Sequence, residues 1–229
     1  MLSLLRAPAV GAFLLAALPV AAADYDLVAD WNPGTNPNGA WAYQSGSVPM
    51  PYWSSIVALA GSGGYAPSAA GGHFLPVFWQ SAGSGSDILV HSHDGFNGFS
   101  ATGEATLTWT SPIDGTIDLS GYFYYAQSSL LRSNEVSVTL AGTPLASATV
   151  SYLQHQDYAN RYTFSFNDLT VAAADKLSIT FIRSPGFAPG TVTALDIHIV
   201  AQPVPEPATV AQMLGGLAVL AWLARRRSA

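Results

Sequence analysis

The feature that most constrains this chain is the alternation of apolar and polar residues from Leu107 onward. Apolar side chains recur at every second position in five segments, which are 117–125, 136–140, 162–166, 177–181 and 195–199. Successive side chains of a β-strand point to opposite faces of a sheet, so this spacing predicts strands with one buried and one solvent-facing side. Turn sequences such as Asp114-Gly115 and Ala141-Gly142 separate the segments. We therefore expect an all-β fold, an antiparallel two-sheet β-sandwich of the jelly-roll kind.

The first half of the chain is less regular. Four short apolar segments predict further strands there, at 26–31, 56–59, 74–79 and 87–91. Loops rich in glycine, serine, asparagine and proline separate them. Since no second domain boundary is visible before the Pro-rich stretch near the end, we expect one sandwich domain over residues 24–201.

Charge and cysteine content exclude several functions. The chain has no cysteine, which rules out disulfides, thiolate metal sites and a cysteine nucleophile. Between Asp24 and Val204 there are four basic and thirteen acidic residues, a formal net charge of −9. Such a surface repels phosphate backbones, so we expect no nucleic-acid partner. It is compatible with neutral glycans or with cations.

The N-terminus has the three parts of a secretion signal. Arg6 supplies a positive charge, Ala7 to Val20 is mostly apolar, and Ala21-Ala22-Ala23 provides small residues. A signal peptidase requires small residues at the third and first positions before its cut, which Ala21 and Ala23 would fill. We expect residues 1–23 to be a helical signal peptide that signal peptidase removes; a buried N-terminal helix is the alternative.

The C-terminus also has three parts in a fixed order. Pro205-Glu206-Pro207 is followed by the mostly apolar run Ala208 to Ala224 and then by Arg225, Arg226 and Arg227. Arginines after an apolar helix stay on the cytoplasmic side, so the preceding domain would lie across the membrane. At about 1.5 Å per residue the run would span roughly 25 Å, short of the roughly 30 Å hydrocarbon core. We expect a single, marginal transmembrane helix that passes through the inner membrane transiently.

Together these C-terminal residues resemble the PEP-CTERM sorting signal of Gram-negative bacteria that make exopolysaccharide. Pro205, Glu206 and Pro207 match its signature tripeptide, and the apolar run and basic tail match their expected places. The resemblance assigns residues 202–229 to the signal and implies recognition by an exosortase, a membrane protease-transpeptidase. It implies a membrane-tethered precursor that later reaches the cell surface or the extracellular space. An ordinary single-pass tail anchor is the alternative.

Parts of the middle are similar to the domain found in many PEP-CTERM substrates. Residues 36–43 (NPNGAWAY) look like an early N-P-N-G-x-W-x-Y element of that domain. Residues 109–116, followed by Ser120-Gly121, are similar to its W-x-x-P-x-x-G…G strand-turn-strand. This resemblance implies a jelly roll like those of carbohydrate-binding modules, and it implies architecture much more than ligand.

Two clusters have metal-ligand chemistry. His91 and His93 lie two residues apart on one predicted strand, so both rings can reach one Zn²⁺, with Asp94 or another residue completing the shell. Four oxygen-bearing side chains in a Gly/Pro-rich loop suit a structural Ca²⁺ instead; these are Asp30, Asn32, Asn36 and Asn38. For the histidines the alternative is a strand end that runs into the Asp94-Gly95 turn with two solvent-facing rings, and for the loop it is ordinary turn chemistry. We expect no other cofactor.

Tyr122 and Tyr124 fall on the predicted outer face of one strand, beside Asp118. Aromatic rings that stack on sugar faces, with polar groups nearby, form a glycan platform. Packing against a neighbouring strand or loop is the alternative. No nucleophile elbow of the G-x-S-x-G kind is present, and we expect no enzyme. The leading hypothesis is a non-enzymatic component of an exopolysaccharide or biofilm matrix; the alternatives are a carbohydrate-binding module and a metal-dependent hydrolase.

Overall fold

A computed structural model describes residues 22–59, 62–69, 76–80, 87–94, 104–127, 130–187, 189–204 and 207–227. The predicted signal peptide, apart from Ala22 and Ala23, lies outside these residues. The chain divides into two units. One is the body of residues 22–203, and the described part of the other is essentially one helix.

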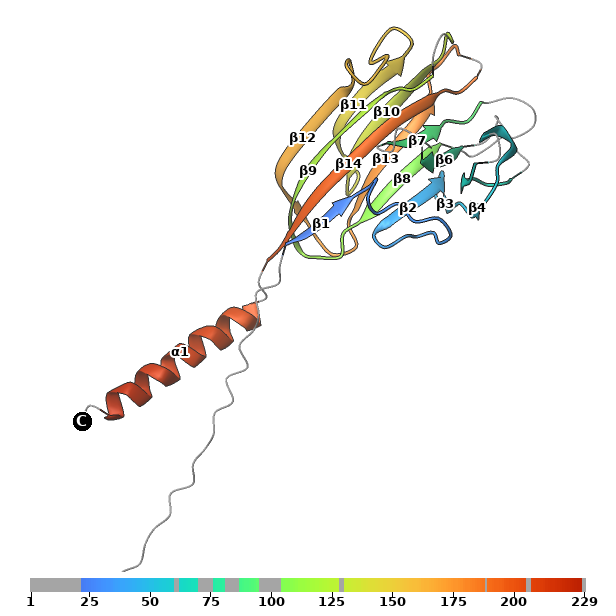
Figure 1. The fold of residues 1–229 in the computed structure, drawn as a ribbon. Helices are drawn as coiled ribbons and strands as arrows, with labels where there is room; N and C mark the ends of the chain where they lie inside the picture. The colour runs from blue at the N-terminus through green and yellow to red at the C-terminus, as the bar shows by residue number, and fades with distance from the viewer. Residues whose placement is uncertain are drawn as a thin grey trace, which may run out of the picture. The chain divides into compact units, whose positions relative to one another are not determined.

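The body is an antiparallel two-sheet β-sandwich, as the alternation predicted (Figure 1). The larger sheet contains, in neighbour order, β12 (Tyr162–Val171), β9 (Gly115–Tyr125), β14 (Val192–Pro203), β7 (Ile88–His91), β6 (Val77–Gln80), β5 (Gly64–Tyr65) and β4 (Tyr52–Trp53), with β1 (Ala23–Asp26) also paired to β14. The smaller sheet contains β11 (Thr143–Ser151), β10 (Ser133–Leu140), β13 (Lys176–Arg183), β8 (Ala105–Thr110), β2 (Trp41–Ser45) and β3 (Val48–Pro49).

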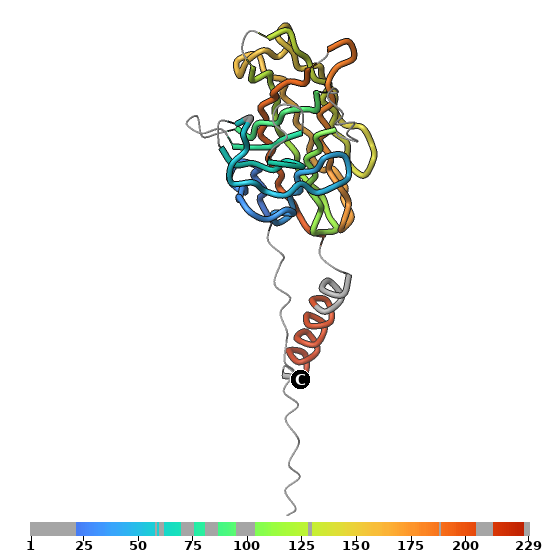
Figure 2. Tube along the Cα trace, turned by 90° about the vertical axis from the view of Figure 1, so that its right-hand side faces the viewer, coloured from blue at the N-terminus to red at the C-terminus, as the bar shows by residue number. Residues whose placement is uncertain are grey.

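From β8 onward the chain crosses repeatedly between the sheets. β8, β10, β11 and β13 belong to the smaller sheet, while β9, β12 and β14 belong to the larger one. Figure 2 shows the trace of the body turned by 90° about the vertical axis from Figure 1. These crossings place the consecutive alternating segments on opposite layers, as in jelly-roll sandwiches. The apolar faces of the two layers therefore point toward each other and enclose the core.

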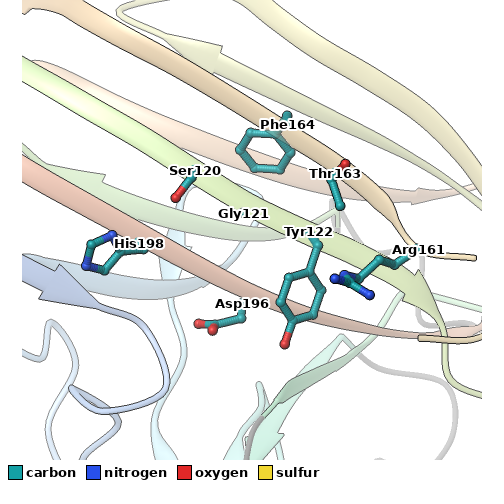
Figure 3. A pocket seen from close by; sticks show the side chains of 8 residues that line it. All are labelled: Ser120, Gly121, Tyr122, Arg161, Thr163, Phe164, Asp196 and His198. Carbon is teal, nitrogen blue, oxygen red and sulfur yellow. The ribbon is translucent and has the colours of Figure 1, made fainter. Parts of the chain in front are cut away.

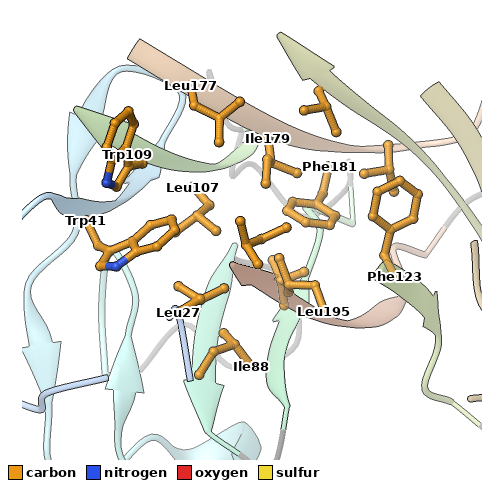
Figure 4. Packing of buried hydrophobic residues seen from close by; sticks show 14 of the residues in the cluster. Leu27, Trp41, Ile88, Leu107, Trp109, Phe123, Leu177, Ile179, Phe181 and Leu195 are labelled. Carbon is orange, nitrogen blue, oxygen red and sulfur yellow. The ribbon is translucent and has the colours of Figure 1, made fainter. Parts of the chain in front are cut away.

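The core lies between the two sheets. Strand β9 shows the pattern clearly: Ile117, Leu119 and Phe123 are almost fully buried, while the residues between them are partly exposed. Figure 4 shows side chains of the two layers packed together; from the smaller sheet these include Trp41, Leu107, Trp109, Leu177, Ile179 and Phe181, and from the larger sheet Ile88, Phe123 and Leu195. Burial of this apolar area is the main term that holds such a sandwich together.

Two strand predictions in the first half are wrong in detail. The strand predicted at 26–31 ends at Asp26, because the Asp26 side chain accepts a hydrogen bond from the Ala29 N–H at 2.8 Å and closes a turn. The strand predicted at 56–59 is a single 3-10 turn, η1 (Val57–Leu59), in which the Leu59 N–H bonds to the Ile56 carbonyl. Four residues are too few for a period of two to exclude a helical turn.

The last strand runs further than predicted. β14 continues to Pro203, and its final residues Gln202 and Pro203 pair with Thr116 and Gly115 of β9. The sequence placed the end of the sandwich at Ala201 because Gln202-Pro203 looks like the start of a linker. Proline is tolerated here because it is the terminal residue of the strand.

The second unit contains α1 (Pro207–Arg227). A helix is therefore present where the apolar run predicts one. Among the residues that the structure describes, however, no helix meets the length and apolarity needed to cross a membrane.

Candidate functional site

Strand register gathers polar and aromatic side chains on the outer face of the larger sheet. On β9, Tyr122 lies opposite Asp196 of β14 on one side and opposite Thr163 of β12 on the other. One step along the same face, Ser120 lies opposite His198. The face follows directly from the alternation, because the residues between these positions point into the core.

Asp87 anchors both predicted tyrosines. The Tyr122 hydroxyl donates to Asp87 Oδ1 and the Tyr124 hydroxyl donates to Asp87 Oδ2, each at 2.6 Å. Asp87 is only 8% exposed. Burial, followed by these bonds to Asp87, raises the pKa of Tyr122 and of Tyr124, so both phenols remain protonated donors. The pair of rings is thus fixed in place on the sheet, with ring centroids 6.3 Å apart.

The loop between β11 and β12 packs over the two rings. Tyr158 meets Tyr122 and Tyr124 edge-on, with centroid distances of 5.5 and 5.8 Å. The Arg161 guanidinium lies 4.1 Å from the Tyr158 ring centroid and 5.3 Å from that of Tyr122. The two tyrosines therefore pack against a loop, as the alternative interpretation had it. The surface that remains open to a ligand lies beside Tyr122, toward Asp196 and Thr163.

That surface is a groove of about 290 Å³, which we call the tyrosine groove. It is lined by Ser120, Gly121, Tyr122, Arg161, Thr163, Phe164, Asp196 and His198. Figure 3 shows Tyr122, Asp196 and Arg161 directed into the same space. The groove therefore combines the rings of Tyr122 and Phe164 with a carboxylate, an imidazole, a guanidinium and the hydroxyls of Ser120 and Thr163. Such a set can bind a ligand that has many hydroxyl groups and an apolar ring face.

Asp196 is the electrostatically unusual residue of the groove. Burial, and then the negative charges of Asp26 and Asp87, raise the pKa of its carboxyl to about 6. Its Oδ1 accepts the N–H of Ile197 at 2.8 Å, and the nearby His198 ring binds Asp24 at 2.6 Å. Near neutral pH the groove therefore carries a carboxylate that protonates under mild acid.

The residues predicted to bind Ca²⁺ hold the N-terminal loop together. The Asn36 amide donates to the carbonyls of Tyr43 and Met50 at 2.6 and 2.8 Å, and its oxygen accepts the Tyr43 N–H. Asp30 accepts the Trp41 indole N–H, and Asn38 donates to the Asp30 carbonyl. The Asn32 carbonyl accepts the Tyr65 hydroxyl.

The predicted Zn²⁺ ligands lie at the end of β7. His91 is buried, and its Nε2 is 3.6 Å from Asp94 Oδ1, while His93 is partly exposed. Ser92 between them donates to Asn134 at 2.6 Å, which ties this end of the larger sheet to β10 of the smaller one. Within the described parts of the chain, no three His, Cys, Asp or Glu side chains are grouped closely enough to hold a metal ion.

The residues predicted to direct export lie at the two ends. Ala23 is the first residue of β1, and Ala21 lies outside the described residues. Pro205 and Glu206 also lie outside them, and Pro207 begins α1. The basic tail, Arg225 to Arg227, is the last turn of α1, where the Arg226 guanidinium lies 4.2 Å from the Trp222 ring centroid.

Several residues of the tyrosine groove were not predicted from the sequence. Asp118, expected beside the two tyrosines, instead accepts the Asp168 N–H at 2.9 Å across a bulge in β12. The acid that does bind the tyrosines, Asp87, is 35 and 37 positions away in the chain. Asp196 and His198 lie in the strand predicted at 195–199, at the positions between its apolar residues. No local signal in the sequence links any of these residues to Tyr122.

Comparisons with known proteins give no family. No protein-family model matches the chain, and no curated protein resembles it in sequence. Among solved structures, the K2 adhesin domain of Lys-gingipain is 12% identical, with a TM-score of 0.40 over 78% of this chain and 99% of that one. The xylan-binding CBM22-1 domain of Paenibacillus barcinonensis Xyn10C is 9% identical, with a TM-score of 0.34 over 74% and 90%. A CBM36 module in complex with calcium and xylotriose is 9% identical, with a TM-score of 0.31 over 53% and 85%. Likenesses this distant assign no function, and the chain's family is not established by them.

Proposed function

We propose that this chain is an exported, non-enzymatic protein of the cell envelope or extracellular matrix, and that its sandwich binds a neutral polysaccharide in the tyrosine groove. The observation that carries the proposal is the composition of that groove: one tyrosine ring beside hydroxyl, carboxylate, imidazole and guanidinium groups on an open sheet face. Sugars present alternating apolar and hydroxyl-bearing surfaces, which such a combination can bind.

Charge favours a neutral ligand over an acidic one. Asp196 lies in the groove, and Asp26 and Asp87 lie close enough to raise its pKa. Arg161 is already engaged with two tyrosine rings and with the Tyr158 carbonyl. A polyuronate would therefore meet more negative than positive charge, and the net charge of −9 between Asp24 and Val204 adds to the repulsion.

The groove supports binding more directly than hydrolysis. A glycosidase needs two carboxylates on opposite sides of the scissile bond. Asp196 is the carboxylate among the residues that line the groove, while Asp87 accepts hydrogen bonds from both tyrosine hydroxyls. An exchange of protons with a substrate would first have to break those bonds. We therefore infer a binding role.

Affinity electrophoresis of the purified chain in gels containing hydroxyethyl cellulose, xylan or alginate tests the binding. We expect retardation by at least one neutral polymer and none by alginate. Thr163→Arg places a long side chain in the groove and should weaken binding by about tenfold or more, since the ligand would lose its contact surface. Thr170→Arg adds the same charge to the same face of β12, outside the groove, and should bind as the parent does. No retardation by any neutral polymer would refute the proposal.

The exported location rests on the two termini. A signal peptide before the sandwich and a PEP-CTERM-type tail after it would direct the domain across the inner membrane and then to an exosortase. Mass spectrometry of the mature protein from an exosortase-positive host should show that residues 1–23 and the tail after the Pro205-Glu206-Pro207 region are missing. An intact Arg225 to Ala229 segment would contradict the sorting proposal without affecting the glycan site.

A further inference from the structure

The outer face of the smaller sheet carries a second groove, of about 490 Å³. It is formed where β11, β10 and β13 lie side by side. Register places Glu135 between Thr149 and Ile182, and places Ser137 opposite Ser147 one step along. We call this surface the serine groove.

The chemistry of the serine groove also suits a neutral, hydroxyl-rich chain. Ser137, Ser147 and Thr149 supply hydroxyls that both donate and accept, and Glu135 supplies an acceptor. Ile182 is 41% exposed and gives the groove one aliphatic surface on which the C–H face of a sugar can lie. None of the residues that line the groove is basic, so an anionic ligand would find no counter-charge there.

The two grooves open on opposite sides of one folded body. The tyrosine groove lies on the outside of the larger sheet and the serine groove on the outside of the smaller one. Stacked sheets lie about 10 Å apart, and here the space between them is filled by the core. One straight stretch of polysaccharide cannot therefore occupy both grooves.

We propose that the serine groove is a second site for neutral polysaccharide, so that a single sandwich links two polysaccharide chains. This inference rests on the proposed function of the tyrosine groove. A protein with two opposed sites would cross-link the matrix that it binds. Two sites that engage the same polymer network also bind it more tightly than either site alone.

The test compares binding with cross-linking, using whichever of hydroxyethyl cellulose and xylan retards the parent chain. Ser147→Arg blocks the serine groove, and Thr143→Arg on the same strand, near its hairpin end, is the matched control. Thr163→Arg blocks the tyrosine groove. Each variant is measured in the affinity gel and in a turbidity titration, with light scattering to confirm that all have the mass of the parent.

We expect the parent and Thr143→Arg to precipitate the polymer at intermediate ratios and to release it at protein excess. Each single blocking variant should still be retarded in the gel, about tenfold more weakly, but should no longer precipitate the polymer. The double variant should do neither. If Ser147→Arg cross-links as the parent does, or if Thr163→Arg abolishes all binding, the serine groove is not a second site. The proposal for the tyrosine groove would still stand. If the parent itself binds no neutral polymer, both proposals fail.

Discussion

At the scale of single residues, the most informative group is the Asp196 carboxyl. Its pKa of about 6 in the folded chain exceeds the ordinary value of 3.8 because it is partly buried near Asp26 and Asp87. The folded state therefore takes up a proton at a higher pH than the unfolded state does. It follows that ionised Asp196 destabilises the fold near neutral pH, and that this cost disappears as the pH falls through 6 toward 4.

We expect Asp196→Asn to raise the unfolding temperature at about pH 7.5 and to have little effect at about pH 4, where the parent carboxyl is protonated in the folded state. Asparagine keeps an oxygen that can accept the Ile197 N–H. Thermal unfolding across this range measures the effect. Glu135→Gln, which removes an exposed carboxyl from the opposite sheet, controls for the loss of one charge. An Asn variant that is less stable than the parent at about pH 7.5 would show that the ionised group is stabilising.

Asn36 distinguishes a structural loop from a calcium site. Its amide nitrogen donates to two carbonyls and its amide oxygen accepts one N–H, so both ends of the side-chain amide are engaged. Replacing the amide nitrogen by a carboxylate oxygen would leave both carbonyls facing a negative charge. A calcium ligand, in contrast, would be improved by the same change.

We therefore expect Asn36→Asp to lower the free energy of unfolding by about 2–4 kcal/mol, since two hydrogen bonds are lost in a partly buried site. Added Ca²⁺ should not restore it. Urea unfolding with CaCl₂ or with EDTA measures both effects, and Gln202→Glu, which adds the same charge at an exposed position of β14, is the control. Recovery of the parent's stability in millimolar Ca²⁺ would favour the calcium interpretation.

At the scale of elements, β9, β10, β12, β13 and β14 could be predicted from alternation, because each is long and has one solvent-facing side. β11 was not predicted, because the small residues Ala146 and Ala148 give its apolar positions only a weak signal. β9 and β13 show the expected pattern residue by residue. The first half could not be predicted equally well, because strands such as β4 and β5 are two residues long. The register between strands could not be predicted either, because it depends on which strands pair. Asp87 comes close to Tyr122 and Tyr124 because β14 pairs with both β7 and β9.

Gly121 lies in the middle of β9, where a side chain has no room. A Cβ built there would lie 2.7 Å from the Asp196 carbonyl oxygen, 2.7 Å from Ile197 Cδ1 and 2.8 Å from the Phe164 ring. Glycine usually weakens a strand, so its presence here is explained by the close approach of β14 and of the Phe164 ring. The neighbouring Ser120 faces the groove on the other side of the sheet.

We expect Gly121→Ala to destabilise the sandwich by about 1–3 kcal/mol, the usual cost of overpacking a core, despite alanine's smaller backbone entropy in the unfolded chain. Ser120→Ala, one residue away, should change stability by less than about 0.5 kcal/mol. Chemical denaturation of both variants measures the difference. Equal stabilities would mean that β9 can move away from β14 at little cost.

At the scale of the whole molecule, the division into two units agrees with separate tasks for the sandwich and for the termini. Residues 22–203 contain both grooves and the entire buried core described above. Helix α1 belongs to the other unit, and the core clusters described above contain none of its residues.

We therefore expect a chain that ends at Val204 to unfold cooperatively within about 1 °C of the full-length protein, because removal of α1 takes nothing from the core. The same truncated chain should keep its retardation by neutral polysaccharide. A second truncation that ends at Ile199 removes the last four residues of β14, and with them the pairing of Gln202 and Pro203 with β9 and of Ala23 with Ala201. The unfolding temperature of that variant should fall by several degrees, because the residues of β1 and β9 that face the removed segment lose their partners. If the chain ending at Val204 were the one to lose stability, α1 would be part of the folded body, and its assignment to export would have to be abandoned.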